Sequence, residues 1–566
     1  MPEIAVAIRQ RTDPADRIGH AGLLVVFVLL MAFLVAPLAA VLMQSVEDRN
    51  GHFVALDNFV AYVQTPALVH SLWNSIWVSA VVTLLTIPAA FLFAYALTRS
   101  CMPLKGVFRT IALTPLLAPS LLAAISFIYW FGNQGVLKDA MQALGIASIY
   151  GAVGIIVSEM FAVFPHALMI LITALTLADA RLYEAADALG TSAARKFLTI
   201  TLPGAKYGLI SAALVTFTLV ITDFGIPKVI GGNFDVLATD IFKLVIGQQD
   251  FQRGAVVAVL LLAPALITFF VDRLIQRKQT SMLTARAVPY SPRPSPGFDL
   301  AMTLYCALIA ALMLAVFGMA LYASFVKFWP YDLSFSLRHY AFGLVDAEVD
   351  TAFFNSLKLA LGTAIGGTVL VFVGAYLLEK TRGVEWLRPG MQLLALVPMA
   401  VPGLVLGLGY IFFFNSPGNP LNGLYHTMTL LVLCTIVHFY TTGHLTAVTA
   451  LKALDAEFEA VSASLKVPFY RTFLRVTLPI CTPTLLDISR YFFINAMTTI
   501  SAVVFLYSPD TKVASIAILN LDEAGEPGPA AAMAVLIAAT SLAACVVYLG
   551  LGWLVERKTQ KWRNLK

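Results

Sequence analysis

Residues 184–203 read EAADALGTSAARKFLTITLP, and this stretch says most about the fold. Its first part, through Ala188, is rich in strong helix formers. Gly190 then stands where a left-handed residue commonly ends a helix. A second short helix is expected around Arg195, before Leu202-Pro203 opens a long apolar run. The pattern predicts two short helices joined by a turn, between two hydrophobic segments.

A second, degenerate copy of this stretch lies 276 positions later and ends with Val476, Leu478 and Pro479. It too is flanked by apolar runs. Small alanine side chains let a partner approach closely, and Glu184 offers a charged anchor. Two such loops on one side of a membrane protein predict a docking surface for a cytoplasmic partner. An interfacial amphipathic helix is the simpler alternative, and the repetition disfavours it.

The composition places the chain in a membrane. Apolar residues make up 59% of 566 positions and charged residues 12%, far from the values of soluble domains. The apolar residues fall in runs of about 20, the length that crosses ~30 Å of hydrocarbon. The net charge of +5 is spread over many short loops, which indicates topology rather than nucleic-acid binding. The five cysteines have no metal-like spacing, and we interpret them as small apolar residues.

The predicted fold class is an all-α polytopic membrane protein with about twelve transmembrane helices in two parallel six-helix repeats. The expected spans are 22–44, 70–98, 107–131, 150–176, 205–225, 254–274, 299–324, 355–379, 390–415, 425–447, 482–507 and 531–554. The repeats cover 22–274 and 299–554, joined by a linker at 275–298 that is rich in Arg, Lys, Ser and Pro. The distribution of Lys and Arg predicts that segment 1–21, the linker and the tail 555–566 are cytoplasmic.

The two halves repeat each other in the same orientation. The matching features are Asn74-Ser75 with Asn355-Ser356, Ala94-Tyr95 with Ala375-Tyr376, Pro115 and Pro119 with Pro398 and Pro402, and Leu202-Pro203 with Leu478-Pro479. A parallel repeat of this kind naturally encloses a central pathway. Proline within a span removes a backbone donor and kinks the helix. The four prolines therefore either line a pathway that rocks or simply kink their helices.

The first copy of the loop resembles the EAA loop of ATP-binding-cassette importer permeases. That pattern is E-A-A, three residues, G, nine residues and I-x-L-P, and residues 184–203 match every fixed position. The whole chain resembles the type I (MetI-like) permease fold, in the subfamily that fuses two halves, as in ferric-iron, thiamine and 2-aminoethylphosphonate importers. The resemblance implies that the loop docks in a cleft of the ATPase subunit. The residues concerned are Glu184, Ala185, Ala186, Gly190, Ile200, Leu202 and Pro203.

The same resemblance implies the partners. Two copies of a separate ATPase subunit, one per loop, would bind ATP and Mg²⁺, because this sequence has no G-x-x-x-x-G-K-[ST] phosphate loop. A periplasmic solute-binding protein would deliver the solute to a multi-pass permease in the bacterial inner membrane. The chain itself is expected to be a transport subunit and not an enzyme, with no catalytic site, metal, cofactor or nucleic acid.

The second loop departs from the pattern. Counted back from Pro479, Ala460 stands at the Glu position and Lys466 at the Gly position. Glu459 comes one residue early, and Leu478 is retained. We expect these five residues to form a second docking site that is not equivalent to the first. Which of them supplies the charged contact is left open.

The expected cargo is 2-aminoethylphosphonate, because the final third of the chain, from Asn495 onward, resembles permeases for that compound. Ferric iron and thiamine are the alternatives within the family. A proton- or sodium-coupled transporter is the alternative from another class. It would place several carboxylates at mid-membrane, where Glu159 is nearly alone.

Polar residues within spans are candidates for the pathway. They are Glu159, Asp223, His438, Asn495, Thr498 and Thr499, beside the four prolines. Hydrogen bonding between helices is an equally good interpretation of the small polar residues. Asp487 and Arg490 are three positions apart, and we expect them to pair on one helix face.

Overall fold

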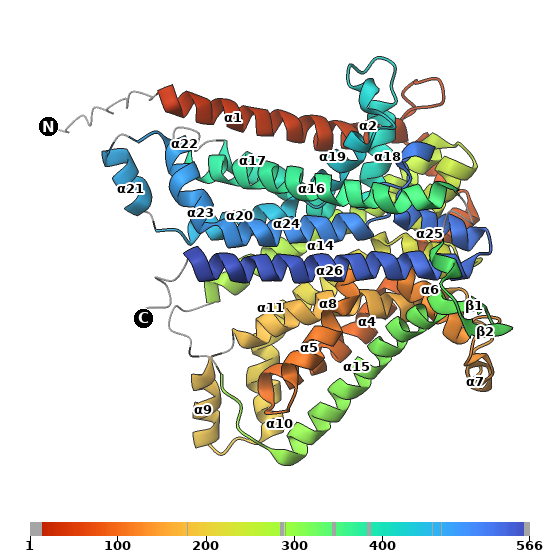
Figure 1. The fold of residues 1–566 in the computed structure, drawn as a ribbon, viewed down its shortest axis with the longest axis horizontal. Coiled ribbons are helices and arrows are strands. Elements are labelled where there is room, and N and C mark those ends of the chain that lie inside the picture. Colours follow the sequence, from red (N-terminus) through yellow and green to blue (C-terminus); the bar gives the residue numbers. More distant parts are fainter. Residues whose placement is uncertain are drawn as a thin grey trace.

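The computed structural model describes residues 14–559, except 178, 283–287, 289, 342–346, 382–386, 456 and 466. Long helices run side by side from one end of the molecule to the other (Figure 1). The first half contains α1 (Pro14–Leu30), α2 (Ala36–Ser45), α3 (Asp57–Val63), α4 (Pro66–Arg99), α5 (Lys105–Leu113), α6 (Ser120–Phe131), α7 (Lys138–Ala143), α8 (Ala152–Thr176), α9 (Ala180–Ala188), α10 (Ala193–Lys196), α11 (Leu202–Thr222), α12 (Gly225–Ile230), α13 (Leu237–Phe242) and α14 (Phe251–Met282). The second half contains α15 (Pro296–Phe325), β1 (Val326–Phe328), β2 (Asp332–Phe335), α16 (Ala347–Lys380), α17 (Arg388–Leu396), α18 (Gly403–Phe414), α19 (Met428–His438), α20 (Tyr440–Lys452), α21 (Glu457–Ser464), α22 (Phe469–Thr472), α23 (Leu478–Ile480), α24 (Thr482–Thr498), α25 (Ala514–Glu523) and α26 (Pro527–Thr559).

Membrane-length helices account for most of the predicted spans. Within the described residues, eight helices are long and apolar enough to cross a membrane, and three bent pairs qualify when each pair is taken as one span. The eight are Arg17–Ser45, Pro66–Arg99, Ala152–Thr176, Ala193–Thr222, Phe251–Gln276, Pro296–Phe325, Val349–Lys380 and Pro527–Val555. The pairs are Lys105–Leu117 with Ser120–Phe131, Arg388–Ala400 with Gly403–Phe414, and Met428–His438 with Tyr440–Lys452. These eleven correspond to eleven of the twelve expected spans.

The remaining span, expected at 482–507, is shorter than predicted. Its helix α24 has 17 residues and ends at Thr498. Thr499 is extended, with φ −67° and ψ 142°, and the chain then forms turns up to Leu506. Apart from Ser501, the residues of these turns are apolar and buried. The apolar run is therefore longer than its helix because part of it packs inside the protein.

The matched prolines break their helices sharply. Pro119 and Pro402 directly precede α6 and α18 and are extended, with ψ of 145° and 141°. Proline has no N–H to continue the helix that comes before it. The two segments of each broken helix therefore meet at 102° in the first half and 108° in the second. Pro115 and Pro398 lie in the 3-10 turns just before these breaks. The prediction of matched kinks is confirmed.

Asn74 and Ser75 tie the start of α4 to the segment that leads into α13. The Asn74 side-chain amide donates to the carbonyl of Asp235 over 3.0 Å. The Ser75 hydroxyl accepts from the Leu237 N–H over 2.8 Å.

The second half repeats this arrangement at the start of α16. The Asn355 amide donates to the carbonyls of Asp510 and Lys512 over 2.9 and 3.0 Å. The Ser356 hydroxyl accepts from the Ala514 N–H over 2.8 Å. The repeated Asn-Ser pair is thus a structural clamp that fixes the segment after the fifth helix of each half.

The first helix of each half packs against the other half. α1 lies along α16 and α2 against α18, while α15 lies along α4, α5 and α6. The Tyr410 hydroxyl of α18 donates to the carbonyl of Phe33 over 2.7 Å. Where the first helix of the second half meets the first half, the Tyr305 hydroxyl of α15 donates to the carbonyl of Ala89 in α4 over 2.8 Å. The sequence repeats are therefore interlocked units in space.

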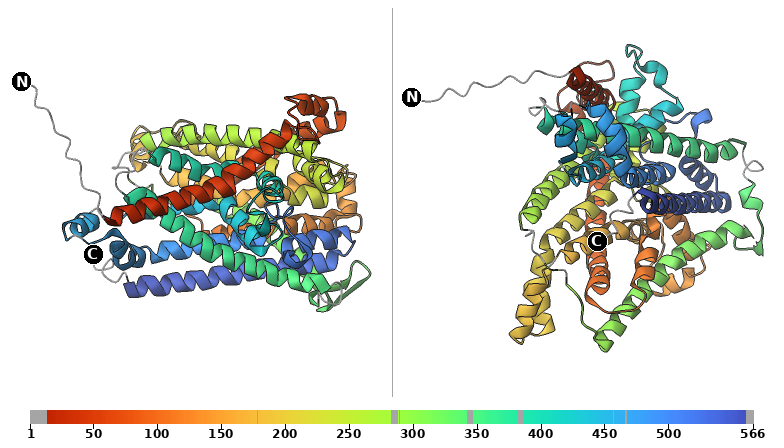
Figure 2. Two further views of the ribbon diagram at one scale, coloured as in Figure 1. Left: turned by 90° about the horizontal axis from the view of Figure 1, so that it is seen from above. Right: turned by 60° about the vertical axis from the view of Figure 1, so that its left-hand side comes forward.

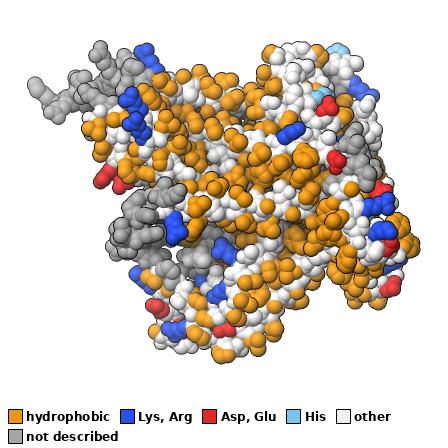
Figure 3. Space-filling model, in the orientation of Figure 1, with side chains coloured by type: hydrophobic (Ala, Val, Ile, Leu, Met, Phe, Trp, Pro, Cys, Tyr) orange, Lys and Arg blue, Asp and Glu red, His pale blue; other side chains and the backbone are white. Residues whose placement is uncertain are grey.

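Both ends of the described chain lie at the end of the molecule that carries α9 and α21 (Figures 1 and 2). The β1–β2 hairpin and α7 lie at the opposite end. On the face drawn in Figure 3, hydrophobic side chains cover the middle of the molecule and charged side chains gather mainly at the two ends. This distribution fits a chain whose middle faces lipid.

Candidate docking loops and pathway

Loop 1, residues 179–203, forms the expected pair of short helices. Asp179 and Ser192 cap α9 and α10 by accepting hydrogen bonds from backbone N–H groups over 3.1 and 3.4 Å. Gly190 lies between the helices with φ +65°, a backbone conformation that favours glycine. The glycine in the pattern is thus explained by the turn it makes.

The second short helix differs from the prediction, because it does not end before the next span. α10, the π-helical segment η3 (Phe197–Thr201) and α11 run on as one helix from Ala193 to Thr222. A π turn changes the local hydrogen-bond pattern, which lets a helix pass a proline such as Pro203. A displacement of loop 1 is therefore carried directly into the fifth span of the first half.

Loop 1 is anchored to α4 by aromatic and polar contacts. Within the loop, the Tyr183 and Thr201 hydroxyls lie 2.9 Å apart, in hydrogen-bond contact, and so join α9 to the base of the following helix. The Arg99 guanidinium lies 5.3 Å from the Tyr183 ring centre. Phe197 packs edge-on against Tyr95 of α4, with ring centres 5.6 Å apart. The Ala-Tyr repeat of the second span thus holds the base of this loop.

The surface that loop 1 presents is largely apolar. Of the predicted docking residues, Glu184, Ala185, Gly190, Leu202 and Pro203 are exposed, Ile200 is half-buried and Ala186 is buried. Three exposed leucines that the sequence analysis did not single out lie among them: Leu182, Leu189 and Leu198. Leu189, next to the turn, is 83% exposed. We call Leu182, Leu189 and Leu198 the leucine face.

Loop 2, residues 457–480, presents the same face. Phe458, Leu465 and Leu474 stand 276 positions after the three leucines, and all three are exposed. Ala460 and Pro479 are exposed and Leu478 is half-buried. Lys466 lies outside the described residues. The repeat of exposed apolar side chains at one fixed spacing is the signal that could have identified the face from the sequence.

The charged residue of loop 2 is paired within the chain. Glu459 forms an ion pair with Lys380 at the end of α16. Lys380 stands 281 positions after Arg99, so each half anchors its loop through the last residue of its long second helix. Tyr376 packs on Phe473 with ring centres 4.6 Å apart, just as Tyr95 of α4 packs on Phe197 of loop 1. Glu459 is thus part of the anchor of its loop.

Loop 1 also contains an internal ion pair. The Lys196 ammonium donates to the Asp187 carboxylate over 2.5 Å, and Arg293 lies 3.7 Å from the same carboxylate. The hydrogen bond from Lys196 is the main reason why the pKa of Asp187 is lowered. This pair joins α9 to α10 across the turn, and it leaves Glu184 as the exposed carboxylate of the E-A-A segment.

Two pathway candidates from different spans meet. The carboxyl groups of Glu159 in α8 and Asp223, directly after α11, lie close enough to interact, and Glu159 Oε1 is buried without a hydrogen-bond partner in the described part of the chain. Asp223 accepts from the Ile226 N–H over 2.9 Å. The structure therefore brings together two acidic groups that lie 64 positions apart in the sequence.

The other polar candidates lie in the second half of the chain. The side chains of Asn495 and Thr498 donate to carbonyls one turn earlier in their own helix, Tyr491 and Ile494, over 2.8 and 3.0 Å. Thr499 stands 276 positions after Asp223 and is buried. His438 ends α19 at the bend of its broken span, against Phe439.

The ion pair predicted within α24 is present. The Arg490 guanidinium lies 2.9 Å from the Asp487 carboxylate, which confirms the prediction from their three-residue spacing. No group of three or more His, Cys, Asp or Glu side chains that could hold a metal ion occurs in the part of the chain that the structure describes.

Known proteins resemble this chain over nearly its full length. The family model described as "Binding-protein-dependent transport system inner membrane component" matches residues 86–281 and again 371–560. The ferric transport system permease protein FbpB of Actinobacillus pleuropneumoniae is 26% identical over 555 residues, covering 95% of this chain and 79% of that protein. The ABC transporter permease protein y4fN of Sinorhizobium fredii is 25% identical over 95% of this chain and 97% of its own. The sulfate transport system permease CysW of Escherichia coli is 22% identical over 37% of this chain and 74% of its own.

The double match agrees with the interlocked halves, the repeated clamps and the repeated loops. The chain belongs to the family of inner-membrane components of binding-protein-dependent transport systems, as a fused two-half type I ABC importer permease.

Proposed function

We propose that this permease carries ferric iron, and that it does so with two ATPase subunits bound at loops 1 and 2. The observation that carries the cargo is the alignment of 95% of the chain with a ferric transport permease. The comparisons reported above give no support to 2-aminoethylphosphonate. They favour the ferric alternative.

The chemistry of the carboxyl pair supports this cargo. Glu159 and Asp223 offer carboxyl oxygens, the ligands that hard cations prefer. Among the described residues no third His, Cys, Asp or Glu completes a ligand set with this pair, which suits brief contact with a passing cation, because tight coordination would hinder release.

Loops 1 and 2 supply the mechanical connection. In the proposed cycle, each loop binds one ATPase subunit through its exposed apolar face, and closure of the ATPase dimer on ATP draws the loops together. The helix from Ala193 to Thr222 carries this movement into the first half, while Tyr95 and Tyr376 link the loop bases to α4 and α16. The halves then shift from inward-open to outward-open because ATP binding favours one of two states.

The proposed binding of the ATPase at loops 1 and 2 implies which end of the molecule is cytoplasmic. The described chain ends lie at the same end of the molecule as α9 and α21 (Figure 1). We infer that both termini are cytoplasmic and that the hairpin β1–β2 faces the periplasm, where a solute-binding protein docks.

The test is ATP hydrolysis by the reconstituted complex of permease, ATPase and binding protein, with ferric iron, 2-aminoethylphosphonate or thiamine added. Stimulation by ferric iron alone is the expected result. Stimulation by either other compound would overturn the cargo, and transport that persists without ATP on an ion gradient would instead support a secondary transporter. Glu159→Gln should reduce iron uptake, while Asp487→Asn, whose carboxylate is exposed on α24, should leave it near wild type.

A further inference from the structure

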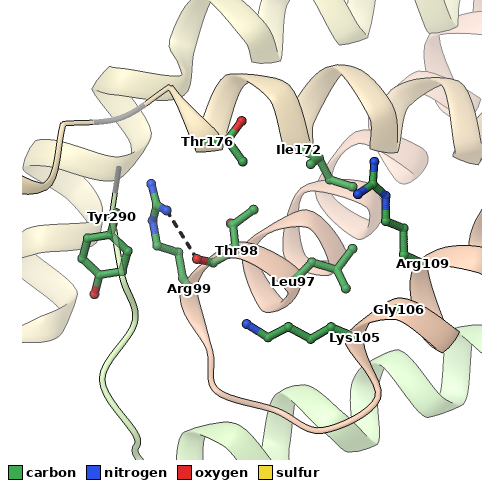
Figure 4. Close-up of a pocket in the computed structure, with 9 residues that line it drawn as sticks. All are labelled: Leu97, Thr98, Arg99, Lys105, Gly106, Arg109, Ile172, Thr176 and Tyr290. Carbon is green, nitrogen blue, oxygen red and sulfur yellow. Dashed lines mark hydrogen bonds between the residues drawn. The ribbon is translucent and has the colours of Figure 1, made fainter. Parts of the chain in front are cut away.

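A basic hollow lies beside loop 1 and is not used by the mechanism above. It has a volume of about 350 Å³ and lies between the end of α4, the first turn of α5 and the end of α8 (Figure 4). Its lining includes Arg99, Lys105 and Arg109, with Thr98 and Thr176. No Asp or Glu is among the described residues that line it. Three cations thus surround one hollow without a carboxylate.

The partners of these cations are neutral. Arg99 is only 7% exposed and donates to the carbonyls of Leu175 and Thr98 over 2.7 and 3.5 Å, while its Nε has no hydrogen-bond partner. The Lys105 ammonium donates to the carbonyl of Ser100. Arg109 is exposed, and no ion pair to it occurs within the described residues. Carbonyl groups satisfy donors without cancelling their charge, so the three cations keep their positive charge at the hollow.

The second half has a carboxylate at the equivalent place. Glu379 stands 281 positions after Thr98, and its side-chain oxygen lies 3.7 Å from the Lys452 ammonium. The same oxygen accepts from the Gln392 amide over 3.5 Å. Gln392 stands 283 positions after Arg109, which is the spacing of the matched prolines. In the second half, therefore, an internal acid supplies the negative charge, and an uncharged glutamine replaces the arginine.

We propose that the hollow of the first half binds a phosphate group, which supplies the negative charge that Glu379 supplies in the second half. Arg and Lys donors are the usual partners of phosphate oxygens. Lys105 and Gly106 also place the first turn of the nine-residue helix α5 at the hollow, where backbone N–H groups favour an anion.

Two sources share this chemistry. One is the headgroup of an anionic lipid, which basic pockets between membrane helices bind at the cytoplasmic side. Leu97 and Ile172 give the hollow apolar walls that suit it. The other source is a soluble phosphate compound from the cytoplasm. The proposal does not depend on the cargo of the permease.

The test measures ligand-dependent thermal stabilisation of the purified full-length chain in detergent, which reports affinity. The probes are phosphatidylglycerol, phosphatidylcholine with the same acyl chains, inorganic phosphate and glycerol 3-phosphate. The variant is the double substitution Lys105→Gln with Arg109→Gln. The matched control is Arg17→Gln with Arg557→Gln, which removes two exposed cations at the same end of the molecule.

A basic side chain contributes roughly 1 kcal/mol to such binding, so the double variant should bind the effective probe about 30-fold more weakly than the wild type and the control. Stabilisation by phosphatidylglycerol alone identifies a lipid headgroup, and stabilisation by the soluble phosphates identifies a free compound. Thr98→Glu keeps both cations and copies the second half, so it should fold and lose the response to every probe. Equal responses of the double variant and the control to all probes, or an undiminished response of Thr98→Glu, would overturn the proposal.

Discussion

Replacing Leu189 by alanine tests whether the leucine face of loop 1 binds the ATPase. Leu189 is 83% exposed, so nearly all of its apolar surface is available to a partner. Complete burial of a leucine side chain contributes ~1.5–3 kcal/mol, and alanine keeps only a small part of it. Leu189→Ala should therefore weaken association by about 1–2 kcal/mol, or about 5- to 30-fold in Kd. The fold should be unaffected, because substitutions at exposed positions usually change stability by less than about 0.5 kcal/mol.

The assay is the Kd between the permease in nanodiscs and its purified ATPase subunit, measured by biolayer interferometry. Leu144→Ala is the control, because Leu144 is 80% exposed and follows α7 at the opposite end of the molecule (Figure 1). Leu465→Ala, the equivalent change in loop 2, should weaken the second binding event. The reasoning is refuted if Leu189→Ala binds like the wild type, or if Leu144→Ala loses as much affinity.

Three further predictions concern the parts that hold this machinery together. Gly190→Ala should lower the stability of the turn by about 1 kcal/mol, because φ is +65°; no clash adds to this cost, since no atom lies within 4 Å of the added Cβ. ATPase binding should therefore weaken. Gly204→Ala, in the helix and equally unobstructed, should leave ATPase binding unchanged. Asn355→Ala leaves two carbonyls without their donor and should lower the unfolding free energy by about 1–3 kcal/mol, more than Asn74→Ala, which frees one; equal losses in thermal unfolding would contradict this. Burial raises the pKa of Asp240 to about 6, so the folded protein disfavours its ionised form and loses stability as the pH rises from about 4 through 6. Asp240→Asn should therefore stabilise the protein at pH 8, by up to about 3 kcal/mol, and have little effect at pH 4; a gain at both pH values would show another cause.

The repeated elements of the fold were predictable from the sequence, because local rules produce them. The helix formers before Gly190 and the proline pairs mark a turn and two breaks through backbone chemistry alone. The spacing of Asp487 and Arg490 likewise defines a contact on one helix face. Each of these features depends on residues within about one or two helical turns, and each appears in the structure.

Features that depend on the tertiary arrangement were not predictable in the same way. The ion pair of Glu459 with Lys380 and the meeting of Glu159 with Asp223 join different helices, which no local spacing reveals. The end of α24 at Thr498 was missed because a buried turn and a lipid-facing helix are equally apolar. The transported solute could not be predicted from the sequence either, because short local matches in the final third of the chain do not determine it.

Because the first helix of each half packs against the other half, the order of synthesis affects how the protein assembles. The principal described partner of α1 is α16, which begins about 320 residues after α1 ends. At a synthesis rate of ~5–20 residues per second, α1 enters the bilayer roughly 15–60 s before that partner exists. The most apolar 18-residue stretch of its span, Arg17–Ser45, has a mean hydropathy of 3.0, the highest such value among the eight single spans within the described residues, so this span is stable in lipid before α16 has been made. Assembly of the two halves is therefore a late event in biogenesis, and α1 lies in the membrane before the half that it packs against has been translated.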